Sequence, residues 1–278
     1  MIDLHTHTTA SDGRCSPAEL VSRAKAAGVG VLSVTDHDTV AACDDVSAAC
    51  EPAGIAFVPG IEITAVQDGV DVHVLGYFFD RRSTALHTFL AQQRRRRVDR
   101  VREMIDRLAA HGVHLDADAI LRPGLDDDTK AVGRPWVARA LVAGGHVADV
   151  SEAFDRWLSR GRPAFLPRLA APPADVFDRI HDANGIASVA HPGLLARDEW
   201  LPDFARAGVD AFEAYHTEHD ADQTAHYLAL AARHGVLVSG GSDFHGDDSH
   251  GGAGPGSVAL PRDACERLYQ RWSRAQGR

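Results

Sequence analysis

Short apolar segments alternate with amphipathic helical segments along most of the chain, and this alternation limits the possible folds more than any other feature. The segments that we expect to form strands are residues 2–5, 31–35, 56–63, 70–79, 185–190, 209–215 and 236–240. Helices are expected between most of them, over residues 17–28, 40–53, 173–184, 199–207, 220–235 and 262–274. Such alternation predicts a parallel sheet or a β/α barrel.

One long stretch, residues 80–169, interrupts the alternation because it carries helix signals and lacks strand signals. Apolar residues recur in it at three- and four-residue spacing on one helix face, namely Val98, Val101, Ile105 and Leu108. We therefore predict an α/β barrel domain from residues 1–79 and 170–278. Residues 80–169 would form a helical insertion that covers the active site.

The composition excludes several classes of protein. The chain has 278 residues and a net charge of −10, so a broad surface for duplex nucleic acid is not expected. Its apolar runs are shorter than the roughly 20 residues of a membrane span, and it begins without a signal-peptide core, so we expect a cytoplasmic protein. The run from Arg94 to Arg97 could contact an oligonucleotide, although a solvated helix face is the commoner role of such a run.

Histidines and carboxylates stand where the predicted strands end. The chain has 16 histidines but only 2 lysines, and imidazole is a common metal ligand. The side chains at or just after strand ends are those of His5, His7, Asp12, His37, Glu62, His191, Asp243 and His245. In a β/α barrel the carboxyl ends of the strands meet at one mouth, so these residues would form one cluster.

This cluster is typical of a metal centre. Many titratable groups buried together would be costly unless cations neutralised the carboxylates. The set combines nitrogen and carboxylate donors without cysteine, which suits zinc, manganese or iron. Two such ions can clamp the attacking and leaving oxygens of a phosphoryl group, so the pattern predicts phosphate ester hydrolysis.

Five motifs resemble those of the polymerase and histidinol phosphatase (PHP) family, in particular its free-standing nucleotide phosphatases. In chain order they are Asp3-Leu4-His5-Thr6-His7, Thr35-Asp36-His37-Asp38-Thr39, Pro59-Gly60-Ile61-Glu62, Ala190-His191-Pro192 and Gly241-Ser242-Asp243-Phe244-His245. The resemblance implies a distorted β/α barrel of seven strands with a trinuclear metal centre. From the donors and the resemblance together we expect two or three divalent ions, Mn, Fe or Zn.

The resemblance also implies how the ligands divide among the metals. The first ion would be bound by His5, His7, Glu62 and Asp243, the second by Glu62, His73 and His191, and the third by Asp12, His37 and His245. Glu62 would bridge two ions, and we expect Glu62, Asp243 and His245 to be catalytic. Asp36 and Asp38 would orient His37.

The resemblance further implies substrate contacts, of which Arg134 in Gly133-Arg134-Pro135 is the first; Arg168 and His216 are further candidates. The favoured reaction is hydrolysis of a nucleoside 3′,5′-bisphosphate to a monophosphate by a metal-bound hydroxide, with short oligonucleotides as possible substrates. Histidinol-phosphate phosphatase is the nearest competing activity. A non-catalytic PHP module and a metal-dependent amidohydrolase also remain open.

Overall fold

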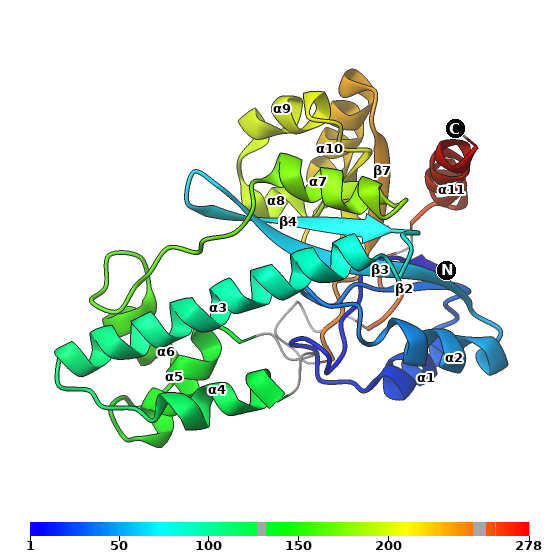
Figure 1. Ribbon diagram of the computed structural model, residues 1–278. Coiled ribbons are helices and arrows are strands. Elements are labelled where there is room, and N and C mark those ends of the chain that lie inside the picture. Colours follow the sequence, from blue (N-terminus) through cyan, green and yellow to red (C-terminus); the bar gives the residue numbers. More distant parts are fainter. Residues whose placement is uncertain (127–131, 247–253, 259, 278) are drawn as a thin grey trace. The chain divides into compact units, whose positions relative to one another are not determined.

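The computed structural model describes residues 1–126, 132–246, 254–258 and 260–277 (Figure 1). The chain divides into two compact units. One contains Met1–Phe89 and Ala171–Arg278, and the other contains Leu90–Ala170.

The first unit is built on a sheet of seven strands in sequence order. The strands are β1 (Ile2–Asp3), β2 (Val31–Val34), β3 (Ala56–Gln67), β4 (Val70–Tyr77), β5 (Ile186–Val189), β6 (Ala211–His216) and β7 (Leu237–Gly241). The backbone N–H of Leu4, which follows β1, donates to the carbonyl of Gly240 in β7 at 3.2 Å, and beyond both strands Thr6 forms a parallel bridge with Phe244. The sheet therefore nearly closes on itself, and the predicted distorted seven-stranded β/α barrel is confirmed.

One strand, β4, runs against the others. It pairs antiparallel with both β3 and β5, whereas the remaining pairs are parallel. Asp68 and Gly69 join β3 to β4, and their φ angles of 50° and 75° match the left-handed conformations of a tight hairpin turn. Since β3 continues to Gln67, Glu62 lies inside this strand and not at its end, where the sequence pattern had placed it.

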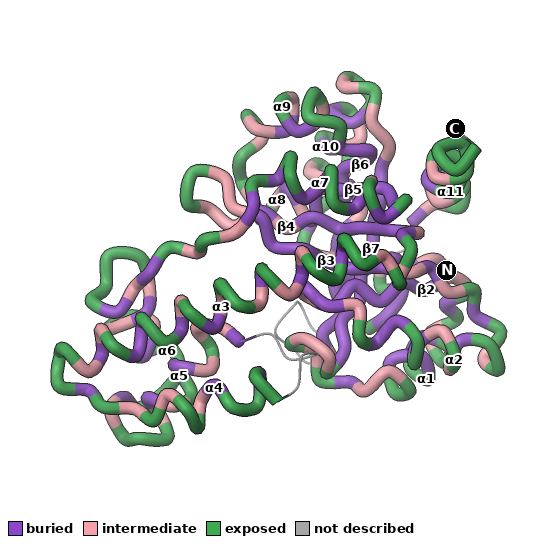
Figure 2. The backbone as a smooth tube through the Cα atoms, in the orientation of Figure 1, coloured by how far each residue is buried: buried purple, intermediate pink, exposed green. Residues whose placement is uncertain are grey.

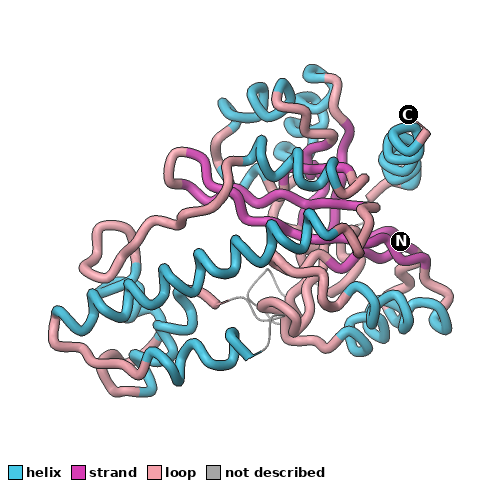
Figure 3. Tube along the Cα trace, viewed as in Figure 1, coloured by secondary structure: helices cyan, strands magenta, loops and turns pink. Residues whose placement is uncertain are grey.

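Helices connect most of the other strands (Figure 3). In the first unit they are α1 (Pro17–Ala26), α2 (Cys43–Ala53), α7 (Pro173–Asp182), α8 (Pro192–Leu195), α9 (Leu201–Arg206), α10 (Ala221–His234), α11 (Arg262–Gln276) and the 3₁₀ turn Asp198–Trp200. The start of α1 is fixed by a capping box, in which the hydroxyl of Ser16 and the side chain of Glu19 bind each other's backbone N–H. None of the described helices is long and apolar enough to cross a membrane.

The strands of the first unit are buried almost throughout (Figure 2). Side chains such as those of Leu4, Ile61, Ile63 and Phe212 are fully inaccessible to solvent. A separate cluster beneath α1 and α2 includes Leu20 and Val46. A rigid apolar frame therefore holds the ends of the strands.

The second unit is helical and has its own core. The helix α3 (Thr84–Ala110) begins in the first unit and continues into the second, which also contains α4 (Ala117–Asp126), α5 (Arg134–Ala143), α6 (Val150–Ala153) and a π-helical turn (Phe154–Leu158). The predicted apolar face of α3, namely Val98, Val101, Ile105 and Leu108, is buried in this core. That the insertion covers the active site stays a prediction.

Candidate metal centre

Glu62 lies at the centre of a cluster of imidazoles in the first unit. Its Oε2 atom lies 3.3 Å from His5 Nε2, 3.2 Å from His7 Nε2 and 3.3 Å from His37 Nδ1. Its other oxygen, Oε1, lies 2.8 Å from His73 Nδ1 and 3.1 Å from His191 Nε2. The two oxygens of one buried carboxylate thus face two different sets of ring nitrogens.

Asp243 supplies a second carboxylate to the same cluster. Its Oδ1 atom lies 3.2 Å from the Nε2 atoms of both His5 and His7, and its Oδ2 atom lies 3.4 Å from His216 Nε2. His245, two residues further along, brings its Nε2 within 3.4 Å of Asp12 Oδ1. The Asp12 side chain is 57% exposed, so it marks the side of the cluster that solvent reaches.

Four groups of donor atoms lie close enough to share an ion, with their atoms within 4.8 Å of one another. They are His5, His7, Glu62 and Asp243; His7, Asp12, His37 and His245; His37, Glu62 and His73; and His5, Glu213 and His216. The first group is the set expected for the first ion, and the second contains the set expected for the third. His73 and His191 both contact Glu62, as expected for the second ion, although His37 is also near that position.

Several ring nitrogens of the cluster lack the partners that buried imidazoles normally have, although those of His5 are both hydrogen-bonded. Both nitrogens of His7, together with Nδ1 of His37 and Nδ1 of His73, are buried without hydrogen-bond partners among the described residues. They lie near carboxylate oxygens but without hydrogen-bond geometry. Since buried polar groups are nearly always satisfied, convergent nitrogens of this kind indicate a place for a cation.

The electrostatics of the cluster support the same conclusion. Burial disfavours a charge on His7, but the carboxylates of Asp243 and Glu62 outweigh it and raise the pKa of His7 to about 10. Burial would likewise raise the pKa of Glu62, yet the charges of His37, His73 and His5 hold that pKa well below its ordinary value. The buried carboxylates are therefore stable in their ionised form only beside positive charge. Divalent ions can supply this charge in place of protons on the imidazoles.

The backbone at the site is strained. Asp38, His191 and Asp243 have φ angles of 53°, 25° and 53°, in a region that residues other than glycine rarely adopt. Each follows a strand of the barrel and carries or adjoins one of the cluster's side chains. Such strain is common where a fold fixes functional groups in place.

Glu213 belongs to this site although no sequence motif pointed to it. It is fully buried near the middle of β6, its Oε1 lies 2.9 Å from His5 Nδ1, and its Oε2 accepts a hydrogen bond of 2.7 Å from the backbone N–H of His191. The one signal in the sequence is a charged residue between the apolar residues Phe212 and Ala214 of the predicted strand 209–215. His216, which was predicted as a substrate contact, ends the same strand and is buried beside Asp243, and its contact with substrate stays a prediction.

Asp36 has a different role from the one expected. Its carboxylate accepts hydrogen bonds from the backbone and hydroxyl of Thr8, each at 2.7 Å, and from the hydroxyl of Ser11. It therefore fixes the loop that carries Asp12 and does not orient the ring of His37. Asp38 accepts a hydrogen bond from the backbone N–H of Thr64 at 3.0 Å.

The two predicted arginines lie outside the first unit. Arg134 is the first residue of α5, and its guanidinium lies over the ring of Phe154 at 5.8 Å from the ring centre. Arg168 lies in the segment that leads out of the second unit, between Leu166 and Ala171. Their contact with substrate stays a prediction.

The geometry agrees with the comparison to known proteins. Residues 3–156 match the PHP domain. Over 254 residues the chain is 36% identical to a 5′-3′ exoribonuclease of Haemophilus influenzae, covering 87% of this chain and 89% of the relative. It is 33% identical to a 3′,5′-nucleoside bisphosphate phosphatase of Chromobacterium violaceum, covering 88% and 87%.

A solved structure shows the same fold. This protein of Bifidobacterium adolescentis, described as a metal-dependent phosphoesterase, superposes with a TM-score of 0.82 at 31% identity and covers 97% of this chain and 95% of its own. The matched domain, the relatives and the clustered donors agree on a metal-dependent hydrolase of phosphate esters. The chain therefore belongs to the PHP family.

Proposed function

We propose that this enzyme removes a phosphate from a small nucleotide, with a nucleoside 3′,5′-bisphosphate as the favoured substrate and a nucleoside monophosphate as the product. The proposal rests on the position of Glu62, because its two oxygens face separate sets of imidazoles. A carboxylate placed in this way can be shared by two cations, and two cations together suit a phosphoryl group.

Two or three divalent ions, Mn, Fe or Zn, would be held by His5, His7, Asp12, His37, Glu62, His73, His191, Asp243 and His245. When bound, such ions would polarise a phosphoryl oxygen and lower the pKa of a water molecule toward neutrality. The donor set contains oxygen and nitrogen atoms but no sulfur, which agrees with these ions.

The protein's own side chains would orient and stabilise this assembly. Glu213 fixes the ring of His5, and Asp36 fixes the loop that carries Asp12. Asp243 lies between His5, His7 and His216, so it is well placed to hold positive charge near the reacting group. We assign catalytic roles to Glu62, Asp243 and His245.

Substrate recognition would use residues outside the metal cluster. Arg134 stands at the first position of α5, where backbone N–H groups and the helix dipole also favour an anion. We propose that its guanidinium binds the phosphate that is not hydrolysed, since arginine can bind phosphate through two parallel hydrogen bonds. Arg168 and His216 are the further candidates for contacts with the nucleotide.

A second candidate function is removal of nucleotides from the 5′ end of short RNA. It is favoured by the relative of Haemophilus influenzae, which is named a 5′-3′ exoribonuclease and is 36% identical. Both activities need a metal centre that cleaves a phosphate ester of a nucleotide. They differ in whether a chain of nucleotides must also be accommodated.

A small set of substrates distinguishes these activities. The purified protein, reconstituted with Mn²⁺, should be assayed with adenosine 3′,5′-bisphosphate, a 5′-phosphorylated RNA trimer and histidinol phosphate, with Glu62→Gln as the control for contaminating phosphatases. We expect the highest kcat/KM on the bisphosphate. Preference for the trimer would establish the exoribonuclease function instead, and preference for histidinol phosphate would exclude both nucleotide functions.

A further inference from the structure

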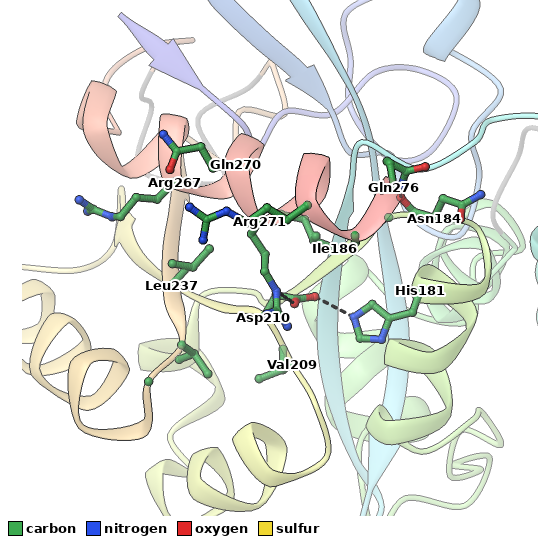
Figure 4. Close-up of a pocket in the computed structure, with 15 residues that line it drawn as sticks. His181, Asn184, Ile186, Val209, Asp210, Leu237, Arg267, Gln270, Arg271 and Gln276 are labelled. Atoms are coloured by element: carbon green, nitrogen blue, oxygen red, sulfur yellow. Dashed lines mark hydrogen bonds and ion pairs between the residues drawn. The ribbon is translucent and has the colours of Figure 1, made fainter. Parts of the chain in front are cut away.

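A cavity of about 710 Å³ lies in the first unit between α11 and the beginnings of β5, β6 and β7 (Figure 4). The proposed metal ligands follow the opposite ends of these strands, since His191 comes after β5 and Asp243 after β7. The cavity is therefore distinct from the metal centre. We propose that it binds a small organic phosphate whose aromatic ring can pack its faces on apolar side chains, such as a nucleoside monophosphate.

A buried carboxylate organises the cavity. Asp210 is only 5% exposed and receives hydrogen bonds from His181 Nε2 at 2.7 Å and from the backbone N–H of Ala187 at 3.0 Å. It also receives a hydrogen bond from Arg271 Nε at 2.8 Å. Figure 4 shows Arg271 reaching down from α11 to this carboxylate, with His181 on the other side of it. Asp210 thus holds the guanidinium of Arg271 in one orientation at the wall of the cavity.

Positive charge gathers on the face of α11 that borders the cavity. Arg267, Arg271 and Arg274 are spaced by four and three residues, so they share this face. Arg271 binds Asp210 through Nε alone, and among the described residues nothing binds its two terminal nitrogens. Arg274 has no hydrogen bond or ion pair within the described part of the chain, whereas Arg267 pairs with Asp263. In a protein of net charge −10, two guanidinium groups with free donors beside a cavity favour an anion, and guanidinium suits phosphate in particular.

The remainder of the cavity suits the apolar part of such a ligand. Its lining includes Ile186, Val209 and Leu237 from the beginnings of the strands. The helix α11 buries few side chains, Ala264 and Leu268. It is also held by the Trp272 ring, which stacks on Phe78 with ring centres 5.5 Å apart, and by polar contacts such as Trp272 Nε1 to the carbonyl of Asn184 at 2.8 Å. The helix therefore spans the cavity without filling it. The volume falls within the range of roughly 300–1,000 Å³ that is usual for small-molecule sites.

A purely structural role for these arginines makes a different prediction. If they served only to fasten α11, Arg271 would suffice, because it alone of the three contacts Asp210. Arg274 contributes nothing to that attachment. Arg274→Gln therefore tests ligand binding without loosening the helix, and Arg262→Gln, at the first position of the same helix, is the control with the same loss of charge.

Hydrogen–deuterium exchange locates the binding directly. The Mn²⁺-loaded protein should be measured with AMP and, separately, with adenosine, which lacks the phosphate. We expect AMP to protect residues 262–276 and 181–186, with an apparent affinity about tenfold or more weaker in Arg274→Gln and unchanged in Arg262→Gln, because a hydrogen bond to a charged group is lost. Adenosine should give no protection there.

Three results would overturn the proposal. Protection by AMP that is confined to the segments around His5, Glu62 and Asp243 would show binding at the metal centre alone. Equal protection in Arg274→Gln and wild type would show that the arginines do not bind the phosphate. Equal protection by adenosine would show that phosphate is not recognised at all.

Discussion

Glu213 Oε1 lies 2.9 Å from Nδ1 of His5, and the other nitrogen of the same ring lies 3.3 Å from Glu62. An ionised carboxylate can only accept, so Nδ1 donates to Glu213. The lone pair of Nε2 is then directed toward Glu62 and Asp243, where an ion would be bound. Carboxylates behind metal-binding histidines commonly fix the ring in this way.

The first prediction is that Glu213→Gln weakens metal binding. The amide keeps the shape but removes the charge that orients His5, so Mn²⁺ affinity should fall by about 10–100-fold. Titration calorimetry of the metal-free protein measures this, and Glu218→Gln in the turn that follows the same strand is the control. Unchanged affinity in Glu213→Gln would mean that His5 is oriented by other contacts.

The second prediction concerns Glu62→Gln, which removes the charge from the carboxylate that faces both sets of imidazoles. We expect turnover to fall by at least about a hundredfold, the usual effect of disturbing a metal site or a charge-stabilising group. Steady-state phosphate release measures the loss, and elemental analysis shows whether an ion has left. Turnover within about threefold of wild type would contradict a bridging role.

The third prediction is that metal removal lowers thermal stability. Without ions, Glu62 and Asp243 lie together in a buried cluster, and ligands that bind only the folded state stabilise it by about 2.7 kcal/mol at a hundredfold excess over Kd. For a chain of this size that corresponds to a Tm lower by about 5–10 °C after chelation. Calorimetry with and without chelator tests this, and restoring Mn²⁺ should restore the Tm.

The fourth prediction is that Arg134→Ala leaves the metal content unchanged but lowers kcat/KM on a nucleoside bisphosphate by about 1.5–3 kcal/mol, the worth of a hydrogen bond to a charged group. Arg139→Ala, an exposed position on the same helix, is the control. A substrate with a single phosphate should lose less. Equal losses on both substrates would assign Arg134 to the reacting phosphate.

The fifth prediction is a pH dependence of stability from His181 and Asp210. The hydrogen bond to Asp210 raises the pKa of His181 above 6.5, so its contribution is full below that pH and is lost as the pH rises through the folded pKa. Burial opposes the charge of Asp210, but His181 and other donors lower its pKa below 3.8, so its contribution disappears in strong acid. Unfolding free energies of wild type and His181→Gln should therefore differ most near about pH 5, between the two ordinary pKa values.

The same comparison in an Asp210→Asn background provides the control, because the pair can no longer form. There the effect of His181→Gln should lose its pH dependence. A difference that persists unchanged to about pH 9 in the native background would show that the imidazole contributes through packing and not through its charge.

Much of the barrel could be predicted because its strands carry a strong local signal. The segments 31–35 and 185–190 are short and apolar and are followed by helices, so sequence alone indicates strands. The reversal of β4 is a property of pairing between strands, which depends on the turn at Asp68-Gly69 and on the register Thr64↔His73. Alternation alone does not specify that direction.

In the candidate site, too, some residues could be predicted from the sequence and others could not. His5 and His7 could be found because residues two apart on a strand share a face, and Asp243 and His245 repeat that spacing. Strand-end spacing could not reveal His73, because it lies within a strand that runs the other way. Glu213 has no such signal either, since an isolated acidic residue in a strand carries no spacing pattern; only burial and its 2.9 Å contact reveal it.

The proposed ligands differ greatly in how far apart they lie along the chain. His37, Glu62 and His73 fall within the first third of the sequence, while Asp243 and His245 follow the last strand. On the ribosome, these three donors, of which Glu62 and His73 lie in the β3–β4 hairpin, emerge long before β7 is made. The order of synthesis therefore allows one ion to be captured by a nascent chain, whereas the group containing Asp243 cannot form until nearly the whole protein has left the exit tunnel.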